Sequence, residues 1–518
     1  MKISRFPFHP FLFAIYPVLG LLSYNLLEVD PKVGLRPILI SVVGALILFL
    51  LVRLFFRGWQ KAAMMTSLLL VLFFSYGHLY TSLRADNLLG SNFGHRYLLM
   101  IDIVIFTLGL WLILTRIKDF NPPTQILNII GLALLILPAI KVIPAVFAPP
   151  AAQDVRTKFT SVTQPLNPDA SQPLPDVYVF LMDTYMRSDY LESDFNLDTK
   201  PFQNQLKALG FYIAECSRAN YFGTRPTVTN LLNFNYLTDL NEDLKQLGYD
   251  PKNDQPLLLN NSYVRSDLEA IGYKTVAFGN HFPWLSFEDA DVYYAIKRKI
   301  TAPTTFEELL MNTTAIRLVN RALGSSATFP PRPKEKANIS LYDERYQITQ
   351  YTIDHIDEAS KVPGPKFTYI HFLISHVPLV EDSNCQFLTD PNYYSKEGYL
   401  PVDENYRNQG YIYSIECSNK VILNAVETIL ENSKTPPVIV IMGDHGHLEK
   451  DNSYSIFNAI YLPDGSDQLY PHISPVNVFR VIFNQQFGTN YELLPDYSYA
   501  DVTDNGQMKE RAASCQLP

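Results

Sequence analysis

Long apolar runs dominate the first part of the chain. Five stretches before residue 148 are each apolar over about the 17–25 residues that a helix needs to cross a bilayer. They are residues 11–27, 38–56, 62–80, 97–117 and 126–147. The first stretch is not followed by a small-residue cleavage site, which disfavours a removed signal peptide. The pattern predicts an N-terminal bundle of five transmembrane helices, residues 1–147.

Short apolar runs characterise the rest of the chain. They are residues 177–182, 274–278, 367–374 and 437–443, and they are rich in β-branched and aromatic residues. Runs of this length that are apolar throughout are typical of strands buried on both faces. Helical patterns such as 266–271 and 414–430 lie between them, as parallel crossovers require. We therefore predict an α/β domain, residues 177–505, with a mostly parallel sheet between helices.

Proline marks the boundaries. Residues 148–176 contain six prolines among Ala, Ser, Gln and Asp, a composition typical of an extended, semi-rigid linker. A Pro- and Ser-rich interruption at 324–336 is expected to be a surface loop within the α/β domain. Residues 506–518 are expected to form a C-terminal tail.

Basic residues in the short loops orient the predicted bundle. One side carries Lys2, Arg5, Arg53, Arg57, Lys61, Arg116 and Lys118, and the other carries Lys32, Arg36, Arg84 and Arg96. The positive-inside rule places the richer side in the cytoplasm. With five spans, everything after residue 147 lies outside the cytoplasm, in the periplasm if the cell has two membranes.

Charge and cysteine usage indicate the class of partner and the cellular compartment. The 518-residue chain has a formal net charge of −9 and a mean hydropathy of 0.00, and no nucleic-acid partner is expected. All four cysteines lie in the C-terminal part, at Cys216, Cys385, Cys417 and Cys515. This placement suits an oxidising compartment, where two disulfides could form in any of three connectivities. Four buried free thiols are the alternative, and the absence of a CxxC pair disfavours a thiolate zinc site.

Polar residues that could bind a metal follow the short apolar runs. In chain order these residues are Asp183, His281, His376 and the pair Asp444-His445. In open α/β sheets, ligands bind beyond the carboxyl ends of the strands, so these side chains could converge. Imidazole and carboxylate together suit Zn²⁺ or Mn²⁺. Taken singly, Asp183 could be a helix N-cap, the histidines could be loop or packing residues, and His371 is interpreted as a core histidine.

A hydroxyl lies at a predicted turn between the first two runs. Gly223-Thr224 followed by Arg225-Pro226 predicts a turn into a helix over 227–236. Backbone N–H groups and the helix dipole at such a terminus favour an anion. Thr224 could therefore attack a phosphate if a metal lowers the pKa of its hydroxyl. The alternative is that Thr224 or Thr227 only caps the helix.

In this order the motifs resemble the alkaline phosphatase and sulfatase superfamily. The architecture is most similar to its bacterial lipoteichoic acid synthase and phosphoethanolamine transferase branch, which has an N-terminal helical bundle and an extracytoplasmic catalytic domain. The matching segments are Asn220-Tyr-Phe-Gly-Thr224, Ser375-His-Val-Pro378 and Gly443-Asp-His-Gly446. The resemblance implies one divalent ion, zinc or manganese with magnesium or calcium as alternatives, bound by Asp183, Thr224, Asp444 and His445. It also implies substrate contacts from His376, His281, Asn220 and Arg225.

The same resemblance implies a reaction. Thr224 would be the nucleophile of a transferase or hydrolase that acts on phosphate esters at the outer face of the membrane, through a phospho-threonine intermediate. Its substrate would be a membrane lipid or a cell-envelope glycan. Sulfatases of the superfamily carry a Cys or Ser that is oxidised to formylglycine, and this chain has Thr224-Arg-Pro-Thr-Val228 at that place. The alternatives are a phosphatase, phosphodiesterase or sulfuric ester hydrolase without transfer, and an inactive sensory or binding module.

Overall fold

The chain forms two compact units in a computed structural model. The structure describes all residues except 1–5, 27–30, 86–93, 148–150, 281–284, 297–302, 319–333, 391–392, 394–402, 447–450, 464, 466, 501–508, 512–514 and 516–518. The helical unit comprises Met1–Pro149 and Arg298–Ser340, and the α/β unit comprises Pro150–Lys297 and Leu341–Pro518.

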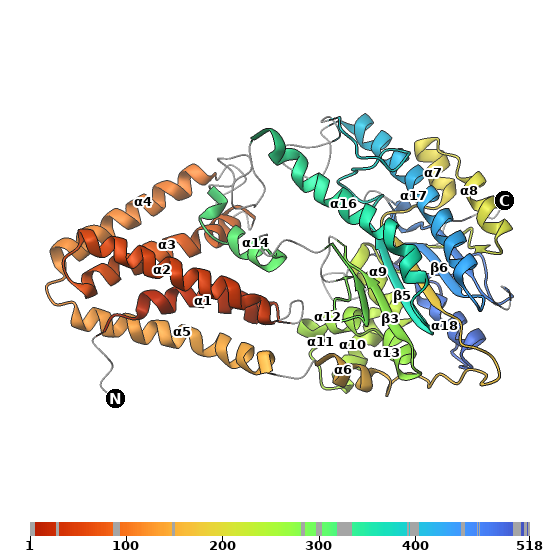
Figure 1. The fold of residues 1–518 in the computed structure, drawn as a ribbon, viewed down its shortest axis with the longest axis horizontal. Coiled ribbons are helices and arrows are strands. Elements are labelled where there is room, and N and C mark those ends of the chain that lie inside the picture. The colour runs from red at the N-terminus through yellow and green to blue at the C-terminus, as the bar shows by residue number, and fades with distance from the viewer. Residues whose placement is uncertain are drawn as a thin grey trace. The chain divides into compact units, whose positions relative to one another are not determined.

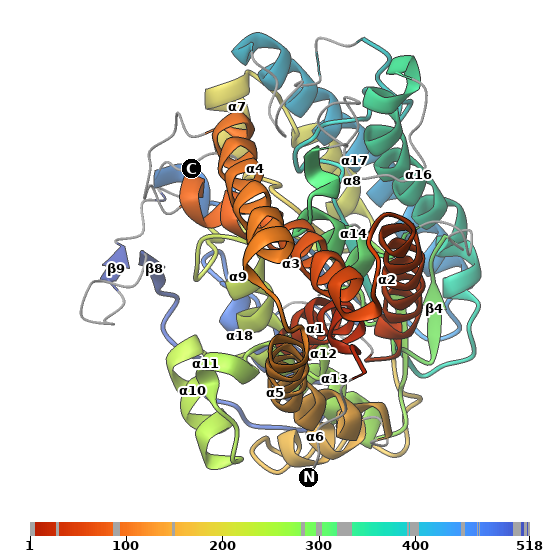
Figure 2. The ribbon, with the colours of Figure 1, turned by 90° about the vertical axis from the view of Figure 1, so that its left-hand side faces the viewer.

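Apolar helices make up the N-terminal part of the helical unit (Figures 1 and 2). They are α1 (His9–Tyr24), α2 (Leu35–Phe55), α3 (Trp59–Ala85), α4 (His95–Trp111) and α5 (Asn121–Phe147), with the short turns η1 (Pro31–Gly34) and η2 (Leu112–Arg116). Within the described residues, four segments are long and apolar enough to cross a membrane: Pro31–Phe55, Trp59–Leu83, His95–Arg116 and Asn121–Val146. The helix α1 has 16 residues, about 24 Å at 1.5 Å per residue, which is shorter than a bilayer core of about 30 Å. Several N-terminal membrane helices are therefore confirmed, and the count of five stays a prediction.

A segment from the middle of the chain packs with these helices. The helix α14 (Thr305–Asn312) begins with a capping box in which Thr304 and Glu307 exchange hydrogen bonds. Glu307 also pairs with Arg36, which precedes the long apolar part of α2. Phe306 and Leu310 are buried in one apolar cluster with residues of α1 and α5.

This grouping differs from the predicted domain boundaries. The sequence pattern predicts one continuous α/β domain over 177–505, whereas Arg298–Ser340 belongs to the helical unit. Residues 324–333 of the predicted surface loop lie outside the described residues.

A seven-stranded sheet forms the centre of the α/β unit (Figure 1), with strand order β2-β7-β6-β1-β5-β3-β4. The strands are β1 (Val177–Met182), β2 (Tyr212–Ile213), β3 (Lys274–Phe278), β4 (Val292–Tyr294), β5 (Lys366–Phe372), β6 (Val438–Gly443) and β7 (Asn458–Tyr461). The pairs β6–β1, β1–β5, β5–β3 and β3–β4 are parallel, and β7 pairs antiparallel with β6 and β2. The last residue of β1, Met182, is level with Phe372 and Gly443. The predicted mostly parallel sheet is confirmed, and three strands end at the same edge.

Helices cover both faces of the sheet. One face packs against α6 (Ala151–Phe159), α9 (Thr224–Asn233), α13 (Tyr263–Ala270) and α18 (Pro475–Gln486), and the other against α7 (Ser188–Phe195), α8 (Lys200–Ala208), α16 (Lys334–Ser360) and α17 (Glu404–Asn432). Smaller elements are α10 (Leu237–Gln246), α11 (Pro251–Asp254), α12 (Pro256–Asn260), η5 (Asp451–Tyr454), and the pair β8 (Ser498–Ala500) and β9 (Lys509–Arg511). Along β1, Val179 and Leu181 enter one core, and Phe180 and Met182 enter the other. Both faces of β1 are buried, which explains why its sequence is apolar throughout.

The helix α6 lies inside the predicted linker. Its Val155 and Phe159 are buried in the core beneath the sheet, and its Arg156 forms ion pairs with Glu269 and Asp289. Val155 and Phe159 are four residues apart and so share one face of a helix. The prediction of an extended spacer over 148–176 is therefore wrong for Ala151–Phe159.

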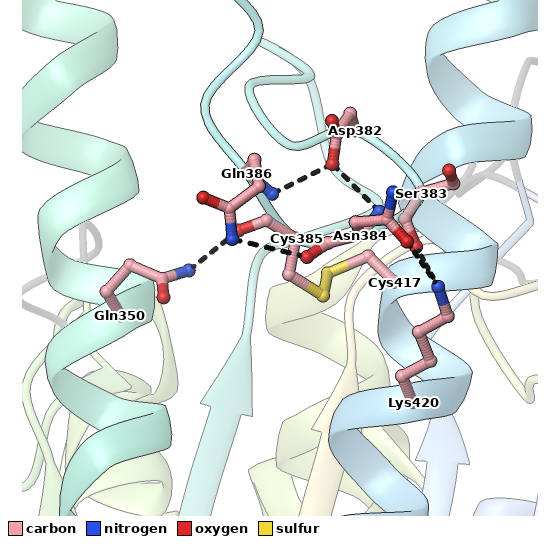
Figure 3. Close-up of a disulfide and its surroundings, with 8 residues drawn as sticks. All are labelled: Gln350, Asp382, Ser383, Asn384, Cys385, Gln386, Cys417 and Lys420. Atoms are coloured by element: carbon pink, nitrogen blue, oxygen red, sulfur yellow. Dashed lines mark hydrogen bonds between the residues drawn. A yellow bond between two sulfur atoms is a disulfide. The ribbon is translucent and has the colours of Figure 1, made fainter.

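Two disulfides are present, as one of the two alternatives predicted. They join Cys216 to Cys515 and Cys385 to Cys417. The first ties the predicted tail to the body of the α/β unit. The second closes a turn that α16 and α17 hold from either side (Figure 3). In that turn, Gln350 of α16 donates to the carbonyl of Cys385 at 3.3 Å, and Lys420 of α17 donates to the carbonyl of Ser383 at 2.7 Å.

The carboxyl of Asp267 on α13 makes stability depend on pH. It is 4% exposed, it accepts one hydrogen bond from Thr163, and burial raises its pKa to about 7. A pKa that is higher in the folded state means that the folded protein keeps this proton up to a higher pH than the unfolded chain does. Stability therefore falls as pH rises from about 4 to 7. Asp267→Asn should remove this loss and add about 2–4 kcal/mol of stability above pH 7, with little gain near pH 4.

Thermal unfolding of the detergent-solubilised chain between pH 4 and pH 8 would measure this effect. The exposed Glu431 on α17 gives the control Glu431→Gln, which should leave the pH profile unchanged. A gain for Asp267→Asn that is the same at every pH, or a loss at pH 8, would contradict the prediction.

Candidate metal centre

Two buried carboxylates follow neighbouring strands. Asp183 comes directly after β1 and Asp444 directly after β6, and neither side chain is exposed. Asp444 Oδ1 accepts hydrogen bonds from the backbone N–H groups of Thr184 at 2.9 Å and His445 at 2.8 Å. Within the described part of the chain, Asp183 Oδ1 and Asp444 Oδ2 have no hydrogen-bond partner. Buried oxygens without a partner are costly, and a cation would compensate both.

The imidazole of His445 supplies a nitrogen beside these oxygens. Its Nδ1 lies 2.8 Å from the carbonyl oxygen of Gly446. Because a carbonyl can only accept, Nδ1 carries the proton and Nε2 carries the lone pair that a metal requires. Nε2 lies 3.6 Å from Asp444 Oδ2 and 3.8 Å from Asp183 Oδ1. The ligand atoms of these three residues all lie within 4.8 Å of one another, and two carboxylates with one imidazole suit Zn²⁺ or Mn²⁺.

The hydroxyl of Thr224 lies beside these three residues. The N-cap of α9 is Gly223, whose φ of 93° is in the region that favours glycine. Thr224 is thus the first residue of α9 and not its N-cap, and Thr227 Oγ1 donates to the carbonyl of Tyr221 at 2.9 Å. The alternative of a simple cap is therefore wrong for both threonines. Thr224 Oγ1 lies 3.4 Å from Asp183 Oδ2 and 3.5 Å from His445 Nε2.

His371 has a role that sequence analysis missed. It is buried within β5, as a core histidine would be, yet its Nε2 lies 3.1 Å from Asp183 Oδ2. Its Nδ1 lies 3.3 Å from the amide nitrogen of Asn280, which donates. His371 Nε2 therefore carries a proton and donates it to the carboxylate, which fixes the orientation of Asp183. The signal in the sequence is a histidine one position before the end of a strand that is buried throughout.

His376 lies in the turn that follows β5. The hydroxyl of Ser375 in this turn donates to the carbonyl of Asp183 at 2.6 Å, and the hydroxyl of Thr184 donates to the carbonyl of Ser375 at 2.5 Å. The imidazole of His376 is close enough for the charges of Asp183 and Asp444 to act on its pKa, which burial nevertheless holds below the ordinary value. The turn therefore brings the His376 imidazole within electrostatic range of the two carboxylates.

The charges and the burial of the site shift the pKa values of its two carboxyl groups in opposite directions. Burial acts to raise the pKa of Asp183, but the neighbouring imidazoles outweigh it and hold that pKa below its ordinary range. These imidazoles belong to His376, His371 and His445. Burial and the charge of Asp183 both raise the pKa of Asp444. A divalent cation would favour the charged form of both carboxyl groups.

The other three residues predicted to contact substrate are Asn220, Arg225 and His281. Asn220 is fully buried, and its amide bonds to Ser474, Tyr497 and Val476, so its predicted contact with substrate finds no support. Arg225 is exposed in the first turn of α9, and its substrate contact stays a prediction. His281 lies outside the described residues.

The comparisons with known proteins extend across both units. No protein-family model matches the chain, and no curated protein matches it in sequence. Solved structures do match. The chain is similar in structure to a membrane-bound phosphoethanolamine transferase. This protein is the integral membrane lipooligosaccharide phosphoethanolamine transferase A of Neisseria meningitidis, with 11% identity, 92% of this chain and 95% of that chain covered, and a TM-score of 0.36.

Two further matches cover less of the chain. The C-terminal periplasmic domain of EcEptC from Escherichia coli in complex with zinc has 12% identity over 67% of this chain and 96% of that one, with a TM-score of 0.40. The lipoteichoic acid synthase LtaP from Listeria monocytogenes has 12% identity over 64% and 77%, with a TM-score of 0.32. Because these identities and TM-scores are low, the chemistry of the site has to be inferred from its own residues.

Proposed function

We propose that this protein is a metal-dependent transferase for phosphate esters at the outer face of a membrane, with Thr224 as its nucleophile. One observation carries the proposal. The Thr224 hydroxyl lies within 3.5 Å of Asp183 and His445, and carboxylate oxygens of Asp183 and Asp444 have no partner among the described residues. A threonine that served packing alone would gain nothing from this placement.

The residues of the site suggest a two-step reaction. Asp183, Asp444, His445 and Thr224 would hold the divalent ion, which would lower the pKa of the hydroxyl and neutralise charge on the phosphate. Thr224 Oγ1 attacks phosphorus in line, and the bond from phosphorus to the leaving alcohol breaks. The hydroxyl proton passes toward Asp183 Oδ2, which lies 3.4 Å away, and the leaving alcohol takes up a proton as it departs. An acceptor hydroxyl then attacks the phosphorus of the phospho-threonine, the bond from phosphorus to Thr224 Oγ1 breaks, and the proton lost by the acceptor returns to Oγ1.

His376 and the helix α9 would stabilise the transferred group. The negative charge on the non-bridging oxygens grows where the N-terminus of α9 presents backbone N–H groups. The negative charge of a bound phosphate would favour the protonated imidazole of His376, whose Nε2 would then donate a hydrogen bond to one of these oxygens. Threonine cannot form formylglycine, so phosphate esters are favoured over sulfate esters.

The location of the site supports a substrate from the cell envelope. The two disulfides of the α/β unit suit an oxidising compartment outside the cytoplasm. The basic loops of the helical unit agree with this orientation if α1 is a fifth span. A membrane lipid would then be the donor, and a lipid or envelope glycan the acceptor.

Metal dependence and a covalent adduct test the proposal. The full chain in detergent is assayed for hydrolysis of a chromogenic phosphodiester, before and after chelation and after addition of zinc or manganese. After exposure to membrane lipids, intact-mass spectrometry detects any group added to the chain, and mass spectrometry of a digest assigns it to the peptide that contains Thr224. We expect activity to disappear on chelation and to return with metal, and a head group to be added to Thr224.

The other outcomes separate the alternatives. Metal-dependent hydrolysis in which only water accepts the phosphoryl group would indicate a phosphatase or phosphodiesterase. A chain that binds no metal and hydrolyses no phosphodiester would be a binding or sensory module.

A further inference from the structure

A buried arginine holds the turn that carries His376. Arg345 lies on α16 and is 4% exposed. Its guanidinium donates to three backbone carbonyls of one short segment: that of Leu373, that of His376 at 2.5 Å and that of Val377 at 2.9 Å. A planar guanidinium has five donors in a fixed geometry, so it can fix several acceptors relative to one another. Arg345 therefore determines the path of the chain from Leu373 to Val377.

One of these carbonyls is shared with His376. The carbonyl oxygen of Val377 accepts from Arg345 and also lies 2.5 Å from His376 Nδ1. Since a carbonyl only accepts, Nδ1 carries the proton. The position of the carbonyl oxygen then sets the direction of the Nδ1–H bond. The opposite nitrogen, Nε2, is then the atom that the imidazole presents to a substrate. By fixing the Val377 carbonyl, the Arg345 guanidinium thus also fixes the orientation of the His376 ring.

The same turn is bonded to the metal ligands. Ser375 donates to the carbonyl of Asp183, and Thr184 donates back to the carbonyl of Ser375. Both Arg345 and the backbone of Asp183 are therefore bonded to this turn. Further along, the segment ends at the disulfide Cys385–Cys417, whose turn is held between α16 and α17 (Figure 3).

A buried carboxyl group lies within range of the Arg345 charge. Glu381, a few residues after the turn, is fully buried, and the Arg345 charge acts on its pKa, which burial raises to about 7. A buried guanidinium is costly, and an apolar side chain could fill the same volume. The three carbonyl acceptors on one turn account for an arginine at this position.

We propose that Arg345 is a positioning residue for His376, fixing the imidazole beside the metal centre through the carbonyls of the turn. This inference rests on the proposed function, in which His376 stabilises the transferred phosphoryl group. It predicts that Arg345 contributes to turnover only through His376. The hydrogen bonds by which Arg345 holds the turn go to backbone carbonyls and not to the imidazole of His376.

A double-mutant cycle tests this coupling. The variants are Arg345→Met, His376→Ala and the double variant, each as the full chain in detergent with a chromogenic phosphodiester. A misplacement of about 1 Å costs roughly 100-fold in rate, so Arg345→Met should lower kcat by about 10- to 100-fold. KM should change by less than about threefold, because the lost contact is made in the transition state. In the double variant, kcat should be no lower than in His376→Ala, within about twofold.

Two variants guard against a simple loss of folding. Arg345→Lys keeps the charge but lacks the planar fork, and should lower kcat as Arg345→Met does. Arg345→Met/Glu381→Gln removes both buried charges, and should restore thermal stability without restoring kcat. A double variant in which the losses from Arg345→Met and His376→Ala multiply would overturn the proposal. Recovery of kcat in Arg345→Met/Glu381→Gln would also overturn it.

A second readout does not depend on activity. The rate at which diethyl pyrocarbonate modifies His376 is measured by peptide mass spectrometry, with the similarly exposed His472 as internal reference. Release of the turn in Arg345→Met should raise the rate at His376 several-fold and leave His472 unchanged. An unchanged rate at His376 would overturn the proposal. A wild-type chain without phosphodiesterase activity would instead refute the proposed function, and this modification rate would still decide the role of Arg345.

Discussion

Thr224→Ala should lower phosphodiester turnover by on the order of 10⁴-fold and abolish the covalent adduct. The substitution removes the hydroxyl that lies 3.4 Å from Asp183 Oδ2 and 3.5 Å from His445 Nε2. It should leave the fold intact, because Gly223 and not Thr224 is the N-cap of α9. Initial rates, intact mass and thermal unfolding of the same preparation measure all three effects.

A neighbouring hydroxyl provides the matched control. Thr227 lies three residues further along α9, is fully buried, and donates to the carbonyl of Tyr221 at 2.9 Å. Thr227→Ala should cost about 1 kcal/mol of stability through the lost hydrogen bond. It should retain both turnover and adduct. The two alanine variants are thus expected to have opposite profiles, one inactive and stable, the other active and less stable.

Thr224→Ser separates the hydroxyl from the methyl group. Serine keeps the nucleophile, so turnover should stay within about 100-fold of the wild type, and the adduct should form on Ser. A Thr224→Ala protein that still accumulates the adduct would remove Thr224 from the reaction.

The parts of the fold that the sequence predicts are those with a local cause. The strands β1, β3, β5 and β6 are buried on both faces, so each appears as a short apolar run. The residue after a strand is polar where the chain leaves the sheet, which places Asp183 and Asp444 at one edge. Gly223 before Thr224 similarly marks the point where α9 begins.

Other features depend on contacts between distant segments. His371 looks like any core residue of β5, because only the parallel pairing of β1 and β5 brings it to Asp183. Arg345 belongs to a helix whose sequence gives no indication of the turn that it holds. The disulfide connectivity is likewise a property of the folded chain. No local pattern contains this information.

Two misassigned segments did carry a local signal. Val155 and Phe159 are spaced by four residues and so form one apolar stripe, but the flanking prolines suggested an extended linker. Thr304 and Glu307 have the spacing of a capping box, which predicts the start of α14. Helix assignment can be read from such spacings, whereas the unit to which a helix belongs cannot.

Asp444→Asn should have opposite effects on the metal-free and the metal-bound protein. Asp444 Oδ1 accepts from two backbone N–H groups, and the oxygen of an asparagine side chain can accept the same bonds. The charge that is removed lies on a fully buried group next to Asp183, whose charge raises the pKa of Asp444. Without metal, the variant should therefore be more stable than the wild type by about 1–3 kcal/mol.

With metal the order should reverse. A ligand at 1,000 times its Kd stabilises a protein by about 4 kcal/mol, and the variant should lose most of this gain. Its turnover should fall by about 10³-fold, because neutral amide oxygens bind a divalent ion weakly. Thermal unfolding in detergent, with a chelator and with zinc or manganese, measures both signs on one sample.

Asp382 gives a control with the same local bonding. Its Oδ1 also accepts from two backbone N–H groups, those of Asn384 and Gln386, at 2.8 Å each, but it lies in the disulfide turn. Asp382→Asn should leave stability nearly unchanged in both conditions, since Asp382 is only partly buried and no metal ligand is lost. If metal stabilised Asp444→Asn as strongly as the wild type, Asp444 would be a structural acceptor for the turn after β6. The combination of a more stable metal-free protein and a lost response to metal is expected only where two buried carboxylates are kept together to bind a cation.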